Sequence, residues 1–445
     1  MASVANPAIR IHTSNGLARA IAALLRPLHA LIVAPSWLFL ATMALMLFHP
    51  PDYQFHSIDR MAFGLLIFVV LLRICLLQRP IHFGAPVTLP MLGVLALAFA
   101  GVLSQPYAAE NWSLFAAKWL VPFALYHLAA YVFNDEISLR RFETFSLVVL
   151  AYLSLVAVLF LLDAKQFIVP RYILDEGLGI HADRARGPFL QAVANGVALN
   201  LLGLVALNAY RRGRLRGVWA FVLLLALPLA IVATRTRAVW LSFAGSMLIL
   251  LFFSPSRRLR RACLGFVLAG SLGLMAAVTC TDRGAALCER LEESSPVMFR
   301  LSMYRAGWEM FLEKPGTGWG ATGMQTELSK RIDDFHQDSF FFHNTYLEIG
   351  VQYGVPGLAL YVWMMLDLFW LGRPPNRGCI SGRSFLDQEF RGVWLLMLGV
   401  YLLNGAFVVM NYQFVNGLLF ATAGLLVAQN RRLAESRVSA SQFDS

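Results

Sequence analysis

The sequence predicts an all-α integral membrane protein. Of its 445 residues, 58% are hydrophobic and only 14% are charged, whereas about a quarter of the residues in soluble domains are charged. The mean hydropathy is +0.61. Apolar runs of about 17 to 22 residues recur along the whole chain, and a helix of that length crosses about 30 Å of hydrocarbon. Because the first run is followed by another run and not by a small-residue cleavage site, we expect no cleaved signal peptide.

About twelve apolar runs are long enough to be transmembrane helices. No internal repeat divides them into matched halves, as it does in many transporters. The segment 14–30 precedes them and has the pattern of an amphipathic helix lying on the bilayer surface. The predicted transmembrane ranges are 31–49, 61–77, 85–104, 113–133, 144–163, 190–209, 218–234, 238–254, 262–280, 356–371, 392–410 and 413–429.

Clusters of arginine predict the orientation. They fall before the first range and then in alternate loops, so with about twelve spans they share one side, which the positive-inside rule assigns to the cytoplasm. Both termini are then cytoplasmic. The net charge of +11 mainly reflects this topology, and we expect no nucleic-acid binding. The loop clusters lie at 211–216, 256–261, 373–391 and 430–432.

This topology defines five predicted regions. They are a cytoplasmic N-terminal segment with the interfacial helix (1–30), transmembrane helices one to nine (31–280), a large periplasmic loop (281–342), transmembrane helices ten to twelve (343–430) and a cytoplasmic tail (431–445).

The large loop between the ninth and tenth spans is predicted to carry a helix. Ser295 is the expected N-cap, Pro296 occupies the first helical position, and the helix ends before Pro315. Apolar residues recur along it at helical spacing, which suits packing on the membrane domain or resting in the membrane interface. This face comprises Val297, Leu301, Tyr304, Trp308 and Phe311 or Leu312.

Several arginines run against the positive-inside pattern, because their loops are assigned to the periplasm. A solvated loop residue is a sufficient explanation for any one of them. Their gathering on one face favours an anion-binding role for the set. They are Arg184, Arg186, Arg235, Arg237, Arg300 and Arg305.

His343 lies on the same face, in the segment FFHNTYLEIGVQYGVPG at the start of the tenth span. Thr345 and Glu348 form a predicted capping box, so His343 is expected just ahead of a helix N-terminus. That position disfavours the imidazolium form and keeps the ring able to accept a proton. The alternatives are that His343 only caps the helix or bonds a loop carbonyl, and that Glu348 is only a capping residue.

Taken together, these segments resemble the O-antigen ligase and O-antigen polymerase superfamily. The pattern R-x-x-x-[YW]-x-x-[AG]-x-x-x-F-x-x-x-P-x-x-G-x-G matches 300–320, and HN-x-Y-L-[EQ]-x-G-x-x-x-G-x-x-G matches 343–357. Upstream, RARGPFLQAVANGVAL and TRTRAVWLSF resemble the family's Arg-x-x-Gly and S-x-S-R-G segments, with Ala194 for Pro, Thr234 and Thr236 for Ser, and Ala238 for Gly. The resemblance covers about residues 184–371.

The resemblance implies a GT-C-like glycosyltransferase that takes its glycan from undecaprenyl diphosphate at the outer face of the bacterial inner membrane. Arg237 and Arg300 would bind the diphosphate and stabilise the charge that develops on it, and Arg184 or Arg186 would add a third contact. His343 would be the general base of an inverting transfer. The other expected substrate-binding residues are Asn195, Tyr304, Arg305, Asn344, Tyr346 and Glu348.

No cofactor and no metal site is predicted. The nine histidines are scattered over both sides of the membrane, and the acidic cluster Asp333, Asp334 and Asp338 is better explained as a solvated loop. Since arginines supply the positive charge, we expect metal-independent transfer.

Two of the five cysteines, Cys280 and Cys288, are predicted to face the periplasm, where disulfides persist. The turn-prone segment between them allows the spacing of about 4.4 to 6.8 Å between Cα atoms that a disulfide needs. The alternative is that Cys280 is still in lipid.

The favoured function is a monomeric ligase, surrounded by membrane lipids, that transfers O-antigen to the lipid A–core acceptor. The nearest alternative is a polymerase, whose Arg-x10-Gly spacing Arg305 and Gly316 match, and a protein O-oligosaccharyltransferase is a related one. A flippase or permease for lipid-linked glycans is the non-enzymatic alternative. The lack of a repeat and of intramembrane charge pairs along a path argues against transport.

Overall fold

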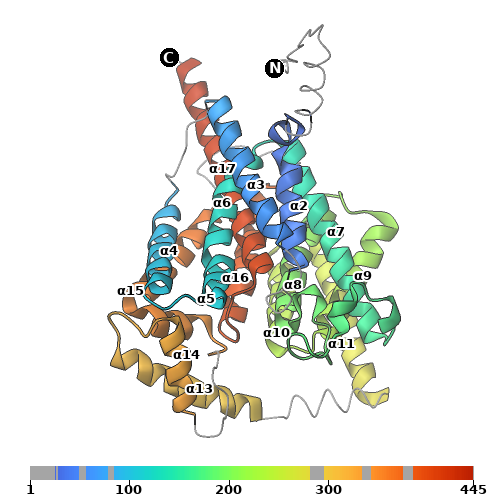
Figure 1. Ribbon diagram of the computed structural model, residues 1–445. Coiled ribbons are helices and arrows are strands. Elements are labelled where there is room, and N and C mark those ends of the chain that lie inside the picture. The colour runs from blue at the N-terminus through green and yellow to red at the C-terminus, as the bar shows by residue number, and fades with distance from the viewer. Residues whose placement is uncertain are drawn as a thin grey trace, which may run out of the picture.

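The computed structural model describes residues 26, 29–49, 57–78, 85–280, 295–332, 342–373 and 384–443. Within these ranges the chain forms helices and no strand. Most helices stand side by side in a bundle, with the C-terminus at one end and α13 and α14 beneath the other (Figure 1). We call the end that carries α13 and α14 the capped end.

Each of the predicted transmembrane ranges falls on a helix of the described residues. Four segments are long and apolar enough to cross a membrane, namely Ala109–Val132, Glu136–Leu161, Ala192–Arg211 and Thr345–Leu371. The total of about twelve spans stays a prediction. The bundle helices are α2 (Pro35–Leu47), α3 (Ile58–Leu76), α4 (Thr88–Leu103), α5 (Ala109–Phe115), α6 (Val121–Val132), α7 (Glu136–Leu161), α8 (Ala192–Arg211), α9 (Gly217–Ala233), α10 (Arg237–Phe253), α11 (Arg257–Cys280), α15 (Thr345–Leu371), α16 (Gln388–Gly405) and α17 (Gln413–Phe443).

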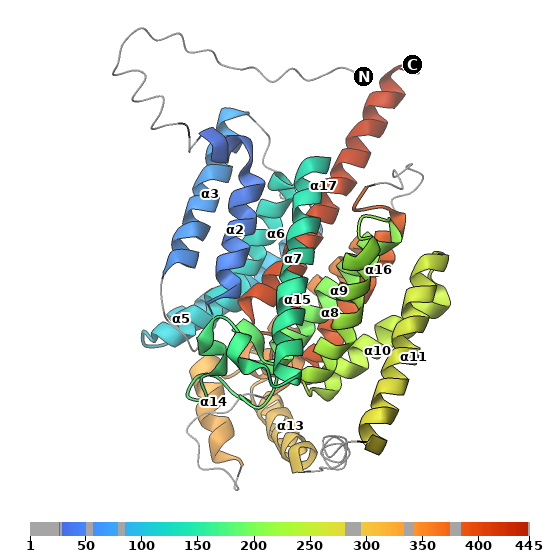
Figure 2. The same ribbon diagram turned by 90° about the vertical axis from the view of Figure 1, so that its right-hand side faces the viewer.

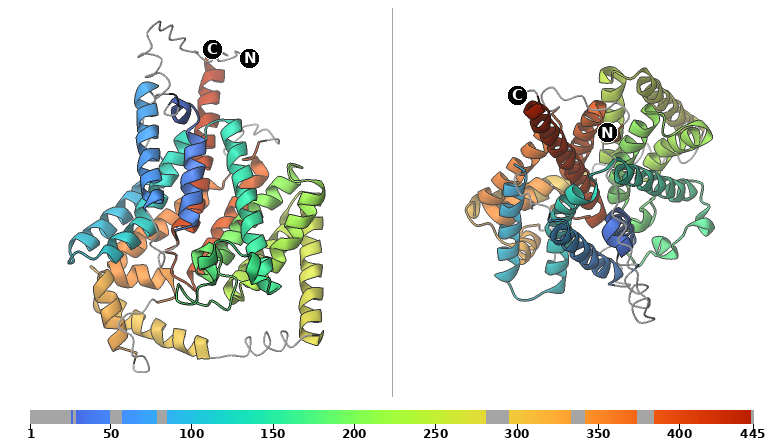
Figure 3. Two further views of the ribbon diagram at one scale, coloured as in Figure 1. Left: turned by 45° about the vertical axis from the view of Figure 1, so that its right-hand side comes forward. Right: turned by 90° about the horizontal axis from the view of Figure 1, so that it is seen from above.

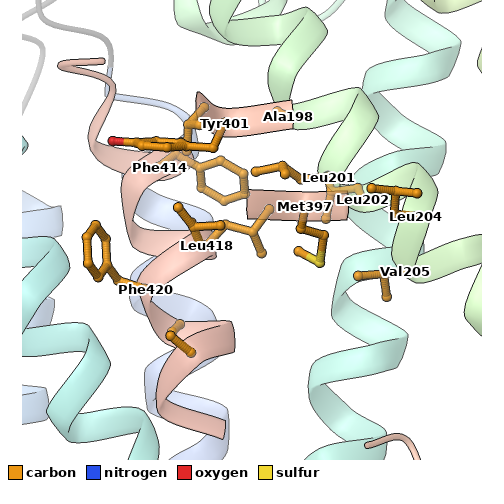
Figure 4. Packing of buried hydrophobic residues seen from close by; sticks show 14 of the residues in the cluster. Ala198, Leu201, Leu202, Leu204, Val205, Met397, Tyr401, Phe414, Leu418 and Phe420 are labelled. Atoms are coloured by element: carbon orange, nitrogen blue, oxygen red, sulfur yellow. The ribbon is translucent and has the colours of Figure 1, made fainter. Parts of the chain in front are cut away.

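The most deeply buried helix is α8, which contacts α7, α9, α10, α16 and α17. Apolar side chains of three helices meet there, with Met397 of α16 between residues of α8 and residues of α17 such as Leu418 (Figure 4). The long α17 crosses the bundle diagonally when it is viewed from above (Figure 3), and it packs mainly on α6. This core fixes the helix ends that carry the functional residues.

Large apolar side chains cover the outward faces of several helices. Hydrocarbon is the natural environment of such a surface, since soluble monomers rarely expose contiguous apolar patches of more than a few hundred Å². On α9 and α10 the exposed residues are Val218, Trp219, Phe221, Val222, Leu225, Leu229, Val232, Leu241, Leu248, Ile249, Phe252 and Phe253. The predicted interfacial segment 14–30 lies almost entirely outside the described residues.

The predicted loop helix is confirmed as α13 (Ser295–Glu313), which lies beside α14 (Ala321–Lys330) under the bundle (Figure 2). The most buried residues of α13 are not those of the predicted apolar face. Met303 and Met310 are fully buried in a cluster with Leu328 of α14 and Val351 of α15, whereas Leu301, Trp308 and Leu312 are exposed. The reason is that α14 and the start of α15 cover the adjacent side of α13, which the sequence of α13 alone does not show. That the exposed apolar residues rest in the membrane interface stays a prediction.

The helix α15 is interrupted at Gly354, whose φ of 68° is outside the helical region. The carbonyls freed by the break accept hydrogen bonds from the backbone N–H groups of Trp319 and Gly320, at 2.9 and 3.1 Å. A Cβ at Gly354 would lie 2.5 Å from the carbonyl oxygen of Pro315, so this close approach requires glycine. The break separates a short segment, 345–353, from the apolar run that follows.

Candidate functional site

The last turn of α16 is where α13 and α15 meet at the capped end. Tyr346 of α15 donates its hydroxyl hydrogen to the carbonyl of Leu402, at 2.7 Å. The Tyr304 hydroxyl of α13 lies 3.2 Å from the carbonyl of Ala406 and 3.3 Å from that of His343. Tyr304, Tyr346 and His343, three predicted site residues, are therefore brought together by one turn of helix.

The same turn also holds the start of α10. The Asn404 amide donates to the hydroxyl of Ser242 at 3.0 Å, and Asn200 of α8 donates to that hydroxyl at 3.2 Å. Arg237 is the first residue of α10, five positions before Ser242, and is exposed at the capped end. The polar contacts thus fix the helix that presents Arg237.

His343 directly precedes the helix cap, as predicted, but the cap itself is Asn344. The Asn344 side-chain oxygen accepts hydrogen bonds from the backbone amides two and three residues later, both at 3.0 Å. The predicted capping box is wrong, because the Thr345 hydroxyl instead donates to the carbonyl of Val408 at 2.8 Å. His343 itself has a φ of 50°, so its backbone adopts the left-handed conformation, which non-glycine residues rarely take.

The environment of His343 favours the neutral imidazole. Burial lowers its pKa from the ordinary 6.5, and the positive charges of Arg300 and His181 lower it further. Arg300, on α13, is partly buried and also acts on Tyr304. A neutral imidazole beside an arginine combines a proton acceptor with an anion-binding group, which suits acid–base chemistry on an anionic substrate.

His181 was missed by the sequence analysis. It lies in the loop before α8, and its charge reaches His343 across 162 positions of the chain. The available signal was its place three residues before Arg184, in the loop already singled out for its arginines.

Replacing His181 by Gln is expected to shift the acid limb of the pH–rate profile to higher pH. The base works as neutral imidazole, so activity falls as the pH drops through the pKa of His343, which lies below 6.5. Removing the positive charge of His181 raises that pKa. The measurement is the transfer rate against pH, with exposed His29→Gln as the control. An acid limb that stays in place would show that His181 does not act on His343.

Arg186 stabilises the loop before α8. Its buried guanidinium donates to the carbonyl of Ile173 at 2.9 Å and to the carbonyls of Asp175 and Leu178. These contacts stabilise the loop and leave Arg184 as the better candidate for a substrate contact.

Arg184 and Arg235 flank one carboxylate at the capped end. Their guanidinium nitrogens lie 3.8 and 3.9 Å from the carboxylate of Asp183. Asn195, fully buried on α8, donates to the carbonyl of Ala185 at 2.8 Å and so ties this segment to the bundle. The position of Asn195 is that of a residue that supports the loop.

Glu348 forms a buried ion pair that the sequence analysis did not foresee. Its carboxylate lies 2.6 Å from the Nζ of Lys118, and the two side chains are only 8% and 7% exposed. Lys118 belongs to a π-helical stretch, Ala116–Leu120, between α5 and α6. We expected no intramembrane charge pairs along a path, and the Lys118–Glu348 pair corrects that expectation. A lone lysine in an apolar run was the available signal.

Arg305 lies away from the group formed by His343 and Arg300. Its side chain is 84% exposed on the outer side of α13 and pairs with Glu309 at 3.3 Å, one helical turn away. An exposed pair of this kind contributes little to stability.

The cysteine and metal predictions fall mainly outside the described residues. Cys288 and the cluster Asp333, Asp334 and Asp338 are not described, nor is the side chain of Cys280. Across the part of the chain that the structure describes, no group of three or more His, Cys, Asp or Glu residues is placed to hold a metal ion.

Residues 219–362 match the family described as O-antigen ligase. The matched segment runs from α9 to the second half of α15 and contains Arg237, Arg300 and His343. It confirms the resemblance found in the sequence. Arg184 and His181, in the preceding loop, lie outside it. None of the curated proteins searched matches the chain.

Proposed function

With an O-antigen ligase family segment at residues 219–362 as the premise, we propose that the chain transfers O-antigen from undecaprenyl diphosphate to a sugar hydroxyl of lipid A–core. The reaction takes place at the capped end, which faces the periplasm when the protein lies in the bacterial inner membrane with both termini cytoplasmic. The observation that carries the proposal is the meeting of α13, α15 and α16 at the capped end, where Tyr304 bonds the carbonyl of His343 and the charge of Arg300 acts on the partly buried imidazole.

His343 acts as the general base. The acceptor hydroxyl oxygen attacks the anomeric carbon of the donor sugar while the bond from that carbon to the phosphate oxygen breaks. The hydroxyl proton moves to an imidazole nitrogen of His343, and the undecaprenyl diphosphate leaves with the bonding electron pair. Attack opposite to the leaving group inverts the anomeric configuration.

Arg237 and Arg300 bind the diphosphate. Negative charge grows on the phosphate oxygens as the bond breaks, and a guanidinium fork can donate two parallel hydrogen bonds to them. Arg184 supplies a third contact, since Arg186 is engaged by the carbonyls of its own loop. Glu348 and Asn344 act indirectly, by holding the helix start that positions His343.

Lysine is expected to replace Arg237 or Arg300 poorly. It keeps the charge but loses the fork, and loss of one preorganised donor costs about 10²–10³ in rate. We therefore expect Arg237→Lys and Arg300→Lys to lose about tenfold or more at subsaturating donor. The control is Arg171→Lys, an exposed arginine at the capped end whose partners are loop carbonyls. Wild-type rates for both test variants would remove the arginines from this role.

Transfer is expected to be metal-independent. Addition of EDTA to purified enzyme with donor and acceptor should leave the rate unchanged, because arginines neutralise the diphosphate. Inhibition by EDTA that a divalent cation reverses would instead point to the acidic cluster Asp333–Asp338.

Glycan profiling of a deletion strain tests the choice of acceptor. Loss of a ligase leaves full-length polymer on the lipid carrier and none on lipid A–core. Loss of a polymerase leaves lipopolysaccharide with a single repeat. Lipopolysaccharide of normal length and amount in the deletion strain would contradict both and favour protein O-glycosylation.

A further inference from the structure

A second cavity opens at the capped end, apart from His343. Its volume is about 420 Å³, within the range of about 300–1,000 Å³ typical of small-molecule sites. It is lined by the end of α2, the start of α3, α5 and the following π-helical stretch, and the segment that leads into α17. The proposed reaction uses none of these residues.

A buried histidine–aspartate pair lies in the cavity wall. The Nδ1 of His49 is 2.7 Å from the Oδ1 of Asp59, and their side chains are 10% and 3% exposed. Burying a carboxylate costs free energy unless it has a partner, and here the partner is His49. Gln413 and Ser113 also line the cavity. Together with the pair they give it several groups that accept or donate hydrogen bonds.

Aromatic rings form the other part of the wall. Trp112 is held at a fixed angle by Phe99 and Phe115, with ring centroids 6.0 and 6.1 Å away. Tyr107 and Tyr412 line the same cavity. A sugar ring presents apolar C–H faces and a rim of hydroxyls, so rings together with a carboxylate match it. Arg60 also lines the cavity and can donate hydrogen bonds to sugar hydroxyls.

The cavity is connected to the reaction centre by the segment 406–412. Thr345, two residues after His343, bonds this segment through Val408 and also accepts from the backbone N–H of Met410 at 3.0 Å. Tyr412, two residues further on, lines the cavity. A glycan held in the cavity therefore lies beside the segment that fixes the start of α15.

We propose that this cavity is a sugar-binding subsite for a glycan substrate, either the acceptor oligosaccharide or the donor glycan. The proposal rests on the proposed function. Asp59 accepts hydrogen bonds from sugar hydroxyls, His49 orients Asp59, and Trp112 stacks on the ring.

The test measures binding and not turnover, so it is separate from the test of His343. Detergent-purified protein is titrated by calorimetry with two soluble probes: core oligosaccharide released from lipopolysaccharide by mild acid, and O-antigen oligosaccharide released from the lipid carrier. We expect wild type and His343→Ala to bind at least one probe equally well. Asp59→Asn and Trp112→Leu should weaken that binding about tenfold or more.

Matched controls lie outside the cavity. Asp163→Asn and Trp37→Leu change exposed residues and should bind like wild type. Ser113→Trp places a large ring in the cavity, leaves His49 and Asp59 unchanged and should also abolish binding, so the test stands even if Asp59→Asn does not fold. Loss of core oligosaccharide binding identifies the acceptor, and loss of O-antigen binding identifies the donor. The proposal is overturned if wild type binds neither probe, or if Ser113→Trp binds both as wild type does.

Discussion

Replacing His343 by Ala is expected to abolish transfer while leaving the protein in the membrane and able to bind donor. General acid–base catalysis contributes about 10²–10⁴ to the rate, and the burial and charges that lower the pKa of His343 keep the imidazole in the form that accepts a proton. The arginines that bind the diphosphate are unchanged in this variant, so donor affinity should be retained.

The measurement is turnover of reconstituted enzyme with purified donor and acceptor, together with direct binding of the donor. His343→Gln is the informative companion, because it keeps a polar side chain without a base. His29→Ala, an exposed histidine at the opposite end of the bundle, is the control. Near wild-type turnover of His343→Ala would exclude His343 as the base.

Local sequence patterns predicted the bundle helices and α13, but not α14. Apolar runs of membrane length fall on α2 to α11 and on α15 to α17, and the Ser-Pro start predicted α13. The burial of Met303 and Met310 on α13 was not predicted, because α14 and the start of α15 cover them and those neighbours are set by tertiary packing. Helix periodicity indicates which residues share a face, but it does not show which face another element will cover.

The same holds for the site, where local patterns predicted some features and tertiary contacts decided the others. The resemblance to the family singled out His343, and its place just before a helix start suits the role of a base. The cap was assigned to Thr345, but serine, threonine and asparagine can all cap a helix. In the structure the Thr345 hydroxyl bonds the backbone of Val408 and Met410, and Asn344 is the cap. Similarly, the choice between Arg184 and Arg186 depends on the fold of the loop, whose carbonyls bind Arg186.

Contacts between distant parts of the chain were the least predictable. Lys118 and Glu348 are 230 positions apart, and neither residue alone indicates the other. The glycines of the two family patterns have a similar explanation, because Gly354 is needed where the 315–320 segment packs against the break in α15. The need for glycine at position 354 becomes clear only when the 315–320 segment and the break in α15 are seen in contact.

Breaking the Lys118–Glu348 ion pair is expected to destabilise the protein strongly. Removing one partner of a buried pair leaves an uncompensated charge, which costs about 3–5 kcal/mol. Lys118→Met and Glu348→Leu should each lower the melting temperature of the detergent-purified protein. The double variant should recover most of the loss, since apolar residues of similar volume often replace a buried pair without cost. Transfer should fall in the single variants too, because Glu348 lies in the short segment of α15 that follows His343.

The double-mutant cycle separates the pair from its surroundings. Lys165 and Asp163 provide the matched control, because they form an exposed pair at 3.7 Å with side chains 49% and 68% accessible. Lys165→Met and Asp163→Asn should leave the melting temperature unchanged, as is usual for exposed pairs; Asn is used at 163 because the backbone there is left-handed, with a φ of 58°. If the two single variants at Lys118 and Glu348 melt with wild type, the pair does not hold α15. If the double variant is as unstable as the sum of the singles, Lys118 and Glu348 act independently, and the position of His343 must depend on the cap at Asn344 and the bonds of Thr345.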